Sequence, residues 1–452
     1  MKYRYIVKED NPGIILLFAG WSMDDNPFRE LKINGYDLMV IWDYRDIEFP
    51  KADMSDYGEV IVAAWSFGVP AAALLIASGR LPISATIAIN GTQHPVDDTL
   101  GIPKDIFNAT LNNLSEENLT KFYRRMTGSR DRFSHFMLHH PERDIDELRD
   151  ELRAIASRKN RVVKWDIAII SEGDRIIPPI NQHNTWASEA IEIISIDDAH
   201  IPDLQSILSS ILTDKSLVAS RFAKVMDSYD TNASVQLHAA ERLINLWNPS
   251  ADSSFDIIEI GCGTGYATRQ YLSMITPRSL QLWDLTIAPG LPEAAKLQCD
   301  AEAQIAKTPH ESADIIFSTS TIQWFNSLPS FFKNAACALR PGGKLIISTY
   351  GNLNFHQLNC GAEVTHCYPG KDALLTMLPE SLKAETVEDE QIDMVFDTPA
   401  DALRHIRLTG VNALSRSTSP SITRSILSNY PRHEDGKYHL TYHPIYLIIR
   451  KL

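Results

Sequence analysis

The sequence predicts an α/β protein with two doubly wound domains, and three observations predict this class. The chain has 452 residues, whereas a single hydrophobic core stops growing at roughly 250 to 300 residues. Short β-branched apolar runs alternate with helical stretches in both halves, which is typical of parallel sheets covered by helices. The two halves carry different glycine-containing turns, so neither is a copy of the other. We therefore expect two unrelated α/β domains.

Composition excludes several classes of protein. Hydrophobic residues make up 44% of the chain and charged residues 22%, as in an ordinary globular protein. The net charge of -14 argues against a general nucleic-acid binder, which needs a clustered basic surface. No apolar run approaches the ~18 residues of a membrane span, and the N-terminus lacks a signal peptide core. We expect a cytoplasmic protein without membrane partners.

The cysteines predict no disulfide framework. Their number is odd, none forms a CxxC pair, and all lie in the second half, at Cys262, Cys299, Cys337, Cys360 and Cys367. Reduced thiols are the natural interpretation.

The first domain, expected over residues 1–212, contains six strand-like runs. They are residues 13–20, 37–44, 59–66, 85–91, 166–174 and 191–197. The fourth and fifth runs are separated by about 70 residues with helical periodicity, too many for a plain connection, which predicts an inserted helical cap. Residues 121–164 contain twelve Lys and Arg against seven Asp and Glu. This basic excess is either an ordinary solvated surface or a docking surface for an acidic partner.

A polar stretch, residues 213–220, is expected to link the first domain to a second one over 221–452. The second domain opens with a helix near Arg221. Its expected strands are residues 255–261, 280–285, 313–320 and 342–350, followed by a closing pair near IDMVF and IYLIIRK.

The third strand of the first half leads into a candidate nucleophile. Ser66 lies in A-W-S-F-G, between the strand EVIVAAW and a helix-forming run, which is the arrangement of a nucleophile elbow, with Ala64 replacing the first glycine of G-x-S-x-G. Asp174 ends the fifth strand and His200 follows the sixth. Serine, acid and histidine in this order at strand ends are typical of an α/β-hydrolase triad, in which His200 takes the serine proton and Asp174 orients the imidazole.

The backbone around this elbow offers candidate oxyanion donors. The amide of Phe67 follows the nucleophile, and that of Trp21 lies in the loop after the first strand, so both are expected to face a developing oxyanion. Other histidines, His94 and the pair His139 and His140, have no metal-ligand spacing. We interpret them as loop and cap residues and predict no metal site.

The second half carries a glycine-rich turn directly after a strand. In Glu259-Ile260-Gly261-Cys262-Gly263-Thr264-Gly265 the glycines let a ligand approach the backbone at a helix N-terminus. A dinucleotide fingerprint would need glycine at position 266, where the chain has Tyr266. A structural turn without a cofactor is the remaining alternative.

This E-x-G-x-G-x-G form resembles motif I of the class I methyltransferases, a Rossmann-like family that uses S-adenosylmethionine. The resemblance implies that Glu259 and the three glycines, Gly261, Gly263 and Gly265, surround the methionine moiety. It further implies that Asp284 accepts the ribose hydroxyls and that Asp300 and Ala301 lie at the adenine. Ser318 begins STSTIQW at the end of the fourth strand, beside the expected entry of the methyl acceptor.

Longer stretches carry more specific resemblances. RFAKVMDSYDTNASVQLHAAERL, IEIGCGTGY, STSTIQWF, LRPGGKLIISTYGNLNFHQL and LTYHPIYLIIRK resemble the malonyl-acyl-carrier-protein O-methyltransferases of biotin synthesis. FAGWSMDDNPF, AWSFG, INGTQHPVDD and SEGDRIIPP resemble the pimeloyl-acyl-carrier-protein methyl ester esterases of the same pathway, whose pattern itself contains A-W-S-F-G. The resemblance implies a fusion of an enzyme that adds a methyl ester with one that removes it.

The resemblance also implies further residues and a partner. Tyr229, in the family's S-Y-D stretch, either orients the acceptor or packs over the cofactor. Because both substrates would be carried on an acidic acyl carrier protein, Arg124 and Arg125 of the cap become candidate docking residues. Two alternatives stay open: a non-catalytic carrier-docking module fused to an active methyltransferase, and a generic esterase beside a small-metabolite methyltransferase.

Overall fold

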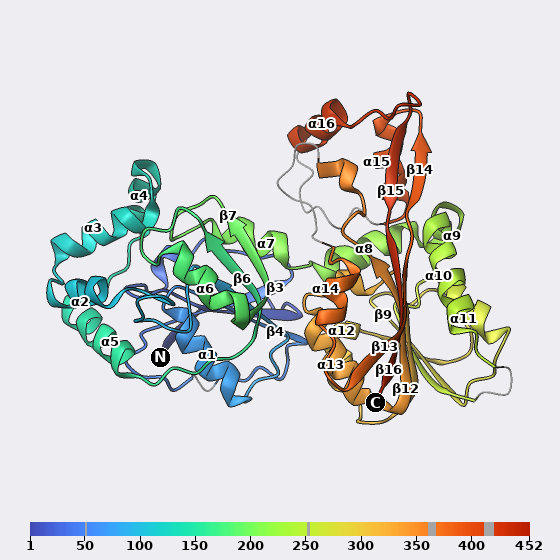
Figure 1. The fold of residues 1–452 in the computed structure, drawn as a ribbon, viewed down its shortest axis with the longest axis horizontal. Coiled ribbons are helices and arrows are strands. Elements are labelled where there is room, and N and C mark those ends of the chain that lie inside the picture. The colour runs from blue at the N-terminus through green and yellow to red at the C-terminus, as the bar shows by residue number, and fades with distance from the viewer. Residues whose placement is uncertain (50–51, 251–253, 360–367, 411–419) are drawn as a thin grey trace. The chain divides into compact units, whose positions relative to one another are not determined.

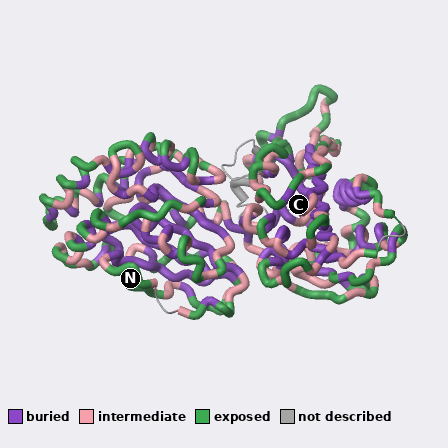
Figure 2. The backbone as a smooth tube through the Cα atoms, turned by 60° about the horizontal axis from the view of Figure 1, so that its bottom comes forward, coloured by how far each residue is buried: buried purple, intermediate pink, exposed green. Residues whose placement is uncertain are grey.

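The computed structural model describes residues 1–49, 52–250, 254–359, 368–410 and 420–452. These residues divide into two compact units, Met1–Ser209 and Ser210–Leu452. Each unit is built around its own seven-stranded sheet (Figure 1). Buried residues concentrate in the interior of each unit, and exposed residues lie around it (Figure 2). None of the described helices combines the length and the apolar character needed to cross a membrane.

The first unit has a sheet in the order β1-β3-β2-β4-β5-β6-β7, parallel except for β1. Its strands are β1 (Lys2–Val7), β2 (Gly13–Phe18), β3 (Tyr36–Trp42), β4 (Glu59–Trp65), β5 (Ala85–Ile89), β6 (Trp165–Ser171) and β7 (Ala190–Ile196). The six predicted strands are present. The edge strand β1 escaped prediction because its first three residues, KYR, are exposed and two of them are charged.

Helices of the first unit fall into two groups. Those that follow sheet strands are α1 (Gly68–Ser78), α6 (Pro179–Glu189) and α7 (Leu204–Ile211). The segment between β5 and β6 forms the predicted helical insertion, which contains α2 (Lys104–Asn112), α3 (Glu116–Thr127), α4 (Arg130–Phe136) and α5 (Ile145–Ser157). Short 3-10 turns are η1 (Asn26–Phe28) and η2 (Met137–His139). We call the insertion between β5 and β6 the cap.

The second unit has a Rossmann-like sheet in the order β10-β9-β8-β11-β12-β16-β13. Its strands are β8 (Asp256–Ile260), β9 (Ser279–Asp284), β10 (Ala295–Gln298), β11 (Ala313–Thr319), β12 (Leu339–Tyr350), β13 (Leu382–Asp389) and β16 (Pro444–Lys451). The first five are parallel, whereas β16 runs antiparallel to both β12 and β13. The strand order reverses between β8 and β11, the switch point at which such sheets bind ligands.

Alternation along the strands explains why both faces of this sheet are covered. Ile257, Ile315 and Ile346 pack in one apolar cluster with α10 (Ser234–Trp247) and α11 (Tyr266–Leu272). Their chain neighbours Ile258 and Ile316 pack in another cluster with α13 (Leu328–Ala338) and α14 (Lys371–Thr376). Because successive side chains of a strand point to opposite faces, each strand contributes to both cores.

Helices and turns of the second unit surround this sheet. They are α8 (Lys215–Val225), η3 (Met226–Ser228), α9 (Tyr229–Asn232), α10 (Ser234–Trp247), α11 (Tyr266–Leu272), α12 (Ala301–Ile305), η4 (Ile322–Trp324), α13 (Leu328–Ala338), η5 (His356–Asn359), α14 (Lys371–Thr376), α15 (Pro399–Leu408) and α16 (Pro420–Asn429). Residues 213–220, expected as a linker, lie in the second unit, and α8 takes up that stretch from Lys215 onward.

Both expected closing strands are present, but they do not pair with each other. IDMVF is β14 (Ile392–Phe396), which pairs with β15 (Tyr438–Tyr442) in a separate two-stranded sheet, whereas IYLIIRK belongs to β16. The partner of β16 beyond β12 is β13, a strand the sequence did not predict. LKAETVED alternates polar and apolar residues only irregularly, and its pairing shifts register between Ala384 and Thr386. Its place in the sheet follows from long-range pairing that no local pattern encodes.

Candidate active sites

Ser66 occupies the tight turn between β4 and α1. Its φ of 56° lies in the left-handed region, which a non-glycine residue adopts only under strain. Small neighbours are required because a side chain on Gly68 would collide with the Phe18 carbonyl and one on Gly91 with the Ser66 carbonyl. The turn therefore lifts the serine hydroxyl out of the sheet at the carboxyl end of β4.

Ser66, His200 and Asp174 form a continuous hydrogen-bonded chain. His200 Nε2 lies 2.9 Å from Ser66 Oγ, and His200 Nδ1 lies 2.8 Å from Asp174 Oδ2. His200 is 1% exposed and Asp174 is 6% exposed, so water is largely excluded from this chain. The three candidates named from strand order, far apart in sequence, meet at one edge of the sheet.

Both partners of Ser66 are held by further hydrogen bonds. Asp174 Oδ1 accepts the backbone N–H of Ile176 at 2.7 Å and of Ile177 at 3.1 Å, while its Oδ2 also accepts Gln182 Nε2 at 2.9 Å. The Trp65 indole N–H donates to the His200 carbonyl at 2.7 Å. The sequence did not single out Gln182, because one residue on a helix has no motif to reveal it.

A cavity of about 470 Å³ opens onto Ser66. Trp21 and Phe67, the expected oxyanion residues, both line it. Within the described part of the chain, neither of their backbone N–H groups donates to a protein acceptor. The rest of the lining is mostly apolar and comes from the β5–α2 loop, the cap and the loop after β6: Ile102, Ile106, Phe107, Thr110, Phe122, Arg125, Leu152, Arg175 and Ile176.

The other expected first-unit residues lie outside this lining. Arg124 is exposed and stacks on Phe133, with 5.0 Å from its guanidinium carbon to the ring centre. His94 pairs with Glu189 at 2.8 Å, and this hydrogen bond raises the pKa of His94. His139 and His140 are exposed cap residues.

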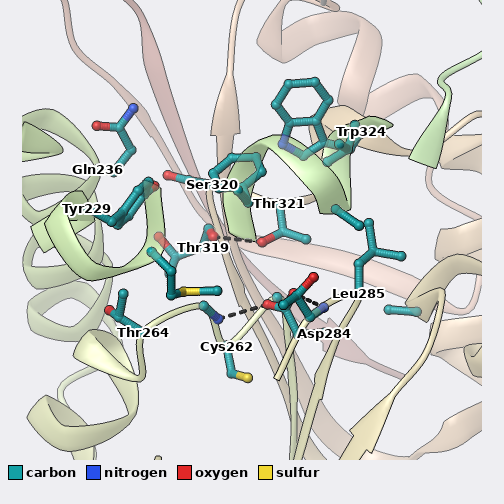
Figure 3. A pocket seen from close by; sticks show the side chains of 18 of the residues that line it. Tyr229, Gln236, Cys262, Thr264, Asp284, Leu285, Thr319, Ser320, Thr321 and Trp324 are labelled. Atoms are coloured by element: carbon teal, nitrogen blue, oxygen red, sulfur yellow. Dashed lines mark hydrogen bonds between the residues drawn. The ribbon is translucent and has the colours of Figure 1, made fainter. Parts of the chain in front are cut away.

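The second unit contains a larger cavity, of about 1070 Å³, at the switch point between β8 and β11. Figure 3 shows its lining, with Asp284 and Cys262 near the glycine loop and Tyr229, Gln236 and Ser320 on another side. The position agrees with the rule that open α/β sheets bind ligands beyond the carboxyl ends of the strands at such a point.

Glycines 261, 263 and 265 give the loop after β8 its shape. All three have positive φ, at 74°, 51° and 80°. A side chain on Gly261 would collide with Thr321, whereas Gly263 has open space where its side chain would be. Gly263 therefore presents bare backbone to the cavity.

Asp284 at the end of β9 is fixed against this loop. Its Oδ2 accepts the Gly263 N–H at 2.8 Å and its Oδ1 accepts the Thr286 N–H at 3.0 Å. Burial raises the pKa of the Asp284 carboxyl, and these two donors oppose that rise. The carboxylate faces the cavity as a hydrogen-bond acceptor.

The expected cofactor residues separate into two sets. Those that line the cavity are Gly261, Gly263, Asp284, Asp300 and Ala301, together with Tyr229. Glu259, Gly265 and Ser318 are outside its lining. Ser318 is buried and donates to the Ile260 carbonyl at 3.0 Å.

Glu259 is turned toward α11 instead of the cavity. Its Oε2 accepts Tyr271 OH at 2.6 Å and Thr268 Oγ1 at 2.8 Å. Burial raises the pKa of Glu259 to about 7, although these two hydroxyl donors lower it. Its carboxylate ties β8 to α11 beneath the glycine loop.

Helix α8 supplies cavity residues that sequence reasoning missed. Lys215, Val218 and Phe222 line the cavity, and Lys215 Nζ lies 2.7 Å from Asp300 and 2.6 Å from Glu302. The apolar spacing of LVASRFAKV was available as a helix signal, but the polar residues before it led to the interpretation of residues 213–220 as a linker, with the helix expected to begin only near Arg221.

The described cysteines form no disulfide, and one group of described side chains has the composition of a metal site. Cys262, Cys299 and Cys337 are free thiols, and burial raises the pKa of Cys299 to about 12. Cys360 and Cys367 lie outside the described residues. One described group, His433, Asp435 and His439, has metal-ligand side chains within reach of one another at the surface. None of these three residues lines either cavity.

Comparison with known proteins gives matches to both units. Residues 1–206 match the family described as pimeloyl-ACP methyl esterase BioG, and residues 258–347 match a methyltransferase domain family. A malonyl-[acyl-carrier protein] O-methyltransferase of Bacteroides fragilis is 35% identical over 459 residues, covering 97% of this chain and 92% of that protein.

Other relatives match one half each. A malonyl-[acyl-carrier protein] O-methyltransferase of Acinetobacter baylyi is 31% identical over 249 residues, covering 52% of this chain and 97% of that protein. The crystal structure of BioG from Haemophilus influenzae is 34% identical, covers 44% of this chain and 94% of that one, and superposes with a TM-score of 0.41.

Proposed function

The chain belongs to the malonyl-[acyl-carrier protein] O-methyltransferase family, and we propose that it catalyses two opposing reactions of biotin synthesis. The second unit methylates the free carboxylate of a malonyl group on acyl carrier protein. The first unit, an α/β-hydrolase, cleaves pimeloyl-acyl-carrier-protein methyl ester to the free acid and methanol. The observation that carries the hydrolase activity of the first unit is the Ser66–His200–Asp174 chain, with contacts of 2.9 and 2.8 Å.

The hydrolase chemistry follows from this geometry. Ser66 Oγ attacks the ester carbonyl while His200 Nε2 takes its proton, and Asp174 stabilises the resulting imidazolium. The Trp21 and Phe67 N–H groups donate to the oxyanion. His200 then returns the proton to the departing methanol, and a water molecule, deprotonated by the same histidine, hydrolyses the acyl-serine.

The cavity of the second unit fits S-adenosylmethionine, the cofactor of this methyltransferase domain family. Gly263 offers uncovered backbone, Asp284 offers two carboxylate oxygens in a partly exposed position, and Trp324 offers a buried indole N–H without a partner among the described residues. Gly261, Gly263 and Asp284 would hold the methionine and ribose parts, and Asp300 and Ala301 the adenine. When bound, the cofactor supplies an electrophilic methyl group.

Residues outside the lining take supporting roles in this proposal. Glu259 holds the glycine loop through α11, Ser318 fixes the end of β8, and Gly265 begins α11. Methyl transfer to a carboxylate needs no strong base, because the acceptor is already ionised near neutral pH. The chain's contribution is alignment and exclusion of water.

Acyl carrier protein is the proposed partner of both units. A free ω-carboxylate is costly to bury in the apolar tunnels of chain-elongating enzymes, whereas its methyl ester is neutral. Masking before elongation and unmasking afterwards gives the two reactions a common purpose. The basic cap, where Arg125 lines the cavity and Arg124 is exposed, is the proposed docking surface for the acidic carrier.

Ser66→Ala tests the bifunctional proposal. The variant should lose hydrolysis of pimeloyl methyl ester carrier protein and keep methyl transfer to malonyl carrier protein, while Asp284→Ala should do the reverse. Equal hydrolysis by wild type and Ser66→Ala would refute the triad, whereas no hydrolysis by either form would favour a non-catalytic docking module. Equal methylation of free malonate and malonyl carrier protein would favour a small-metabolite methyltransferase.

The docking surface is tested by substituting both arginines. Arg124→Gln with Arg125→Gln should lower kcat/KM on the carrier-bound ester by a much larger factor than kcat/KM on a small water-soluble ester, which makes no contact with the exposed cap surface. An unchanged kcat/KM on the carrier-bound ester would refute carrier docking at this site.

A further inference from the structure

Among the described residues that line the cavity of the second unit, Ser320 is the only non-glycine residue with a strained backbone. Its φ of 50° lies in the left-handed region, which is energetically unfavourable for serine. Its N–H donates to the Ser348 carbonyl at 3.1 Å, and its carbonyl accepts Gln323 Nε2 at 2.7 Å. The surroundings thus fix a strained residue at the cavity wall, a recurrent feature of functional sites.

The Ser320 hydroxyl is connected to a buried phenol behind the cavity. Ser320 Oγ lies 3.0 Å from Tyr350 OH, and Tyr350 is 4% exposed. Burial raises the pKa of the Tyr350 phenol, so it stays protonated and can donate to Ser320. Ser320, which is only partly buried, can then direct its own hydrogen into the cavity.

Charge in the cavity decides what Ser320 can bind. Among the described lining residues Lys215 is the single cationic side chain, and it already pairs with Asp300 and Glu302 at 2.7 and 2.6 Å. Tyr229 and Ser320, on another side from Asp284, present neutral hydroxyl donors to the same part of the cavity (Figure 3). Neutral donors orient a carboxylate without forming the ion pair that would weaken it as a nucleophile.

We propose that Ser320 is the acceptor-binding residue that donates a hydrogen bond to the carboxylate to be methylated, with Tyr350 as its positioning residue. The proposal rests on the function proposed above and names how that site holds its acceptor. Tyr350 donates to Ser320 Oγ, Ser320 donates to one carboxylate oxygen, and the other oxygen is left to attack. Tyr229 faces the same group from α9.

Ser320→Gly separates the hydroxyl from the backbone, because glycine adopts this φ without strain. The variant should raise the KM for malonyl carrier protein about 10- to 100-fold, the range for a hydrogen bond to a charged group. Its Kd for S-adenosylhomocysteine, measured by calorimetry, should stay within about twofold, a difference well below 1 kcal/mol. Ser320→Asn, which tolerates left-handed φ and keeps a donor, should recover part of the lost affinity.

Tyr350→Phe tests the positioning role and should raise the same KM by a smaller factor. Tyr446→Phe is its matched control, because that buried phenol donates to Glu390 away from the cavity, and it should leave the KM unchanged. A second readout without turnover is calorimetric binding of malonyl carrier protein to the S-adenosylhomocysteine complex, which should weaken in Ser320→Gly.

The outcomes separate this proposal from the one it rests on. An active wild type with an equal KM in Ser320→Gly would overturn the role of Ser320 alone. Parallel loss of acceptor and S-adenosylhomocysteine affinity would also overturn it, since that pattern reports a damaged cavity. A wild type that neither binds nor methylates malonyl carrier protein would overturn both proposals.

Discussion

Two serines at strand ends carry left-handed backbone in the two sites. Ser66 follows β4 with a φ of 56° and Ser320 follows β11 with a φ of 50°. In each case the turn places a hydroxyl beyond the carboxyl edge of a sheet, where the serine lines a cavity. Strain of this kind costs about 1 to 3 kcal/mol, which the surrounding hydrogen bonds and packing must offset.

Asp174→Asn is predicted to lower kcat for ester hydrolysis about 10³- to 10⁴-fold, because the amide can no longer hold His200 in the required tautomer. The fold should survive, since the amide oxygen can still accept the Ile176 and Ile177 N–H groups. Stopped assays with pimeloyl methyl ester carrier protein measure this effect. Asp197→Asn, an exposed carboxylate in the loop after β7, is the matched control; comparable losses in both variants would contradict the triad.

At the scale of elements, each site is completed by helices that lie outside the regular sheet alternation. The cap, inserted between β5 and β6, contributes Phe122 and Leu152 to the cavity at Ser66, and α8 contributes Lys215 and Phe222 to the cavity of the second unit. The sheets supply the reacting edges, whereas these helices enclose them. Substitutions in such helices should therefore change the affinity for the ligand and leave the type of reaction unchanged.

Lys215→Met is predicted to raise the Kd for S-adenosylhomocysteine roughly tenfold and to lower the free energy of unfolding by about 3 kcal/mol. The reason is that Lys215 is largely buried between Asp300 and Glu302, whose carboxylates would lose their shared cation. Calorimetry and denaturant unfolding measure the two effects. Lys224→Met removes an exposed lysine from the same helix and should do neither; equal behaviour of the two variants would argue against the α8 contact.

Glu259→Gln is predicted to change the pH dependence of stability. The folded-state pKa of about 7 lies above the ordinary value of 4.5, so the folded state binds more protons than the unfolded state between these values. Stability contributed by the protonated form is therefore present at low pH and lost as pH rises toward 7, by at most about 3 kcal/mol.

The comparison of wild type with Glu259→Gln isolates this contribution from other titrating groups. Denaturant unfolding at pH 5 and pH 8 gives the free energy of unfolding of the variant minus that of wild type at each pH. This difference should be more positive at pH 8 than at pH 5. A difference that does not change with pH would show that the burial of Glu259 does not raise its pKa.

At the scale of the whole molecule, two units with separate sheets, cores and cavities share one chain. The described residues of each cavity lining come from one unit only. The two proposed reactions therefore need no shared catalytic residue, and we expect that each can be abolished without the other.

Heat unfolding of the full chain is predicted to show two transitions, of which S-adenosylhomocysteine raises only one. Ligand at 100 times its Kd stabilises the unit that binds it by about 2.7 kcal/mol. Scanning calorimetry with and without the ligand measures this shift, and Asp284→Ala should reduce it. A shift of both transitions by equal amounts would mean that the units unfold together.

The sequence by itself determined the local features: the central strand runs of both sheets, the Ser66 elbow, the glycine loop, and the order in which Ser66, Asp174 and His200 follow their strands. These depend on residue type and short periodicity, which neighbouring residues express wherever they lie in the fold. The tertiary structure alone decided that β13 pairs with β16 and that α8 lines a cavity. It also decided that the Glu259 side chain turns toward Tyr271 and that Ser320 meets Tyr350. Those outcomes depend on strand pairing and side-chain direction between residues distant in the chain, which no local pattern specifies.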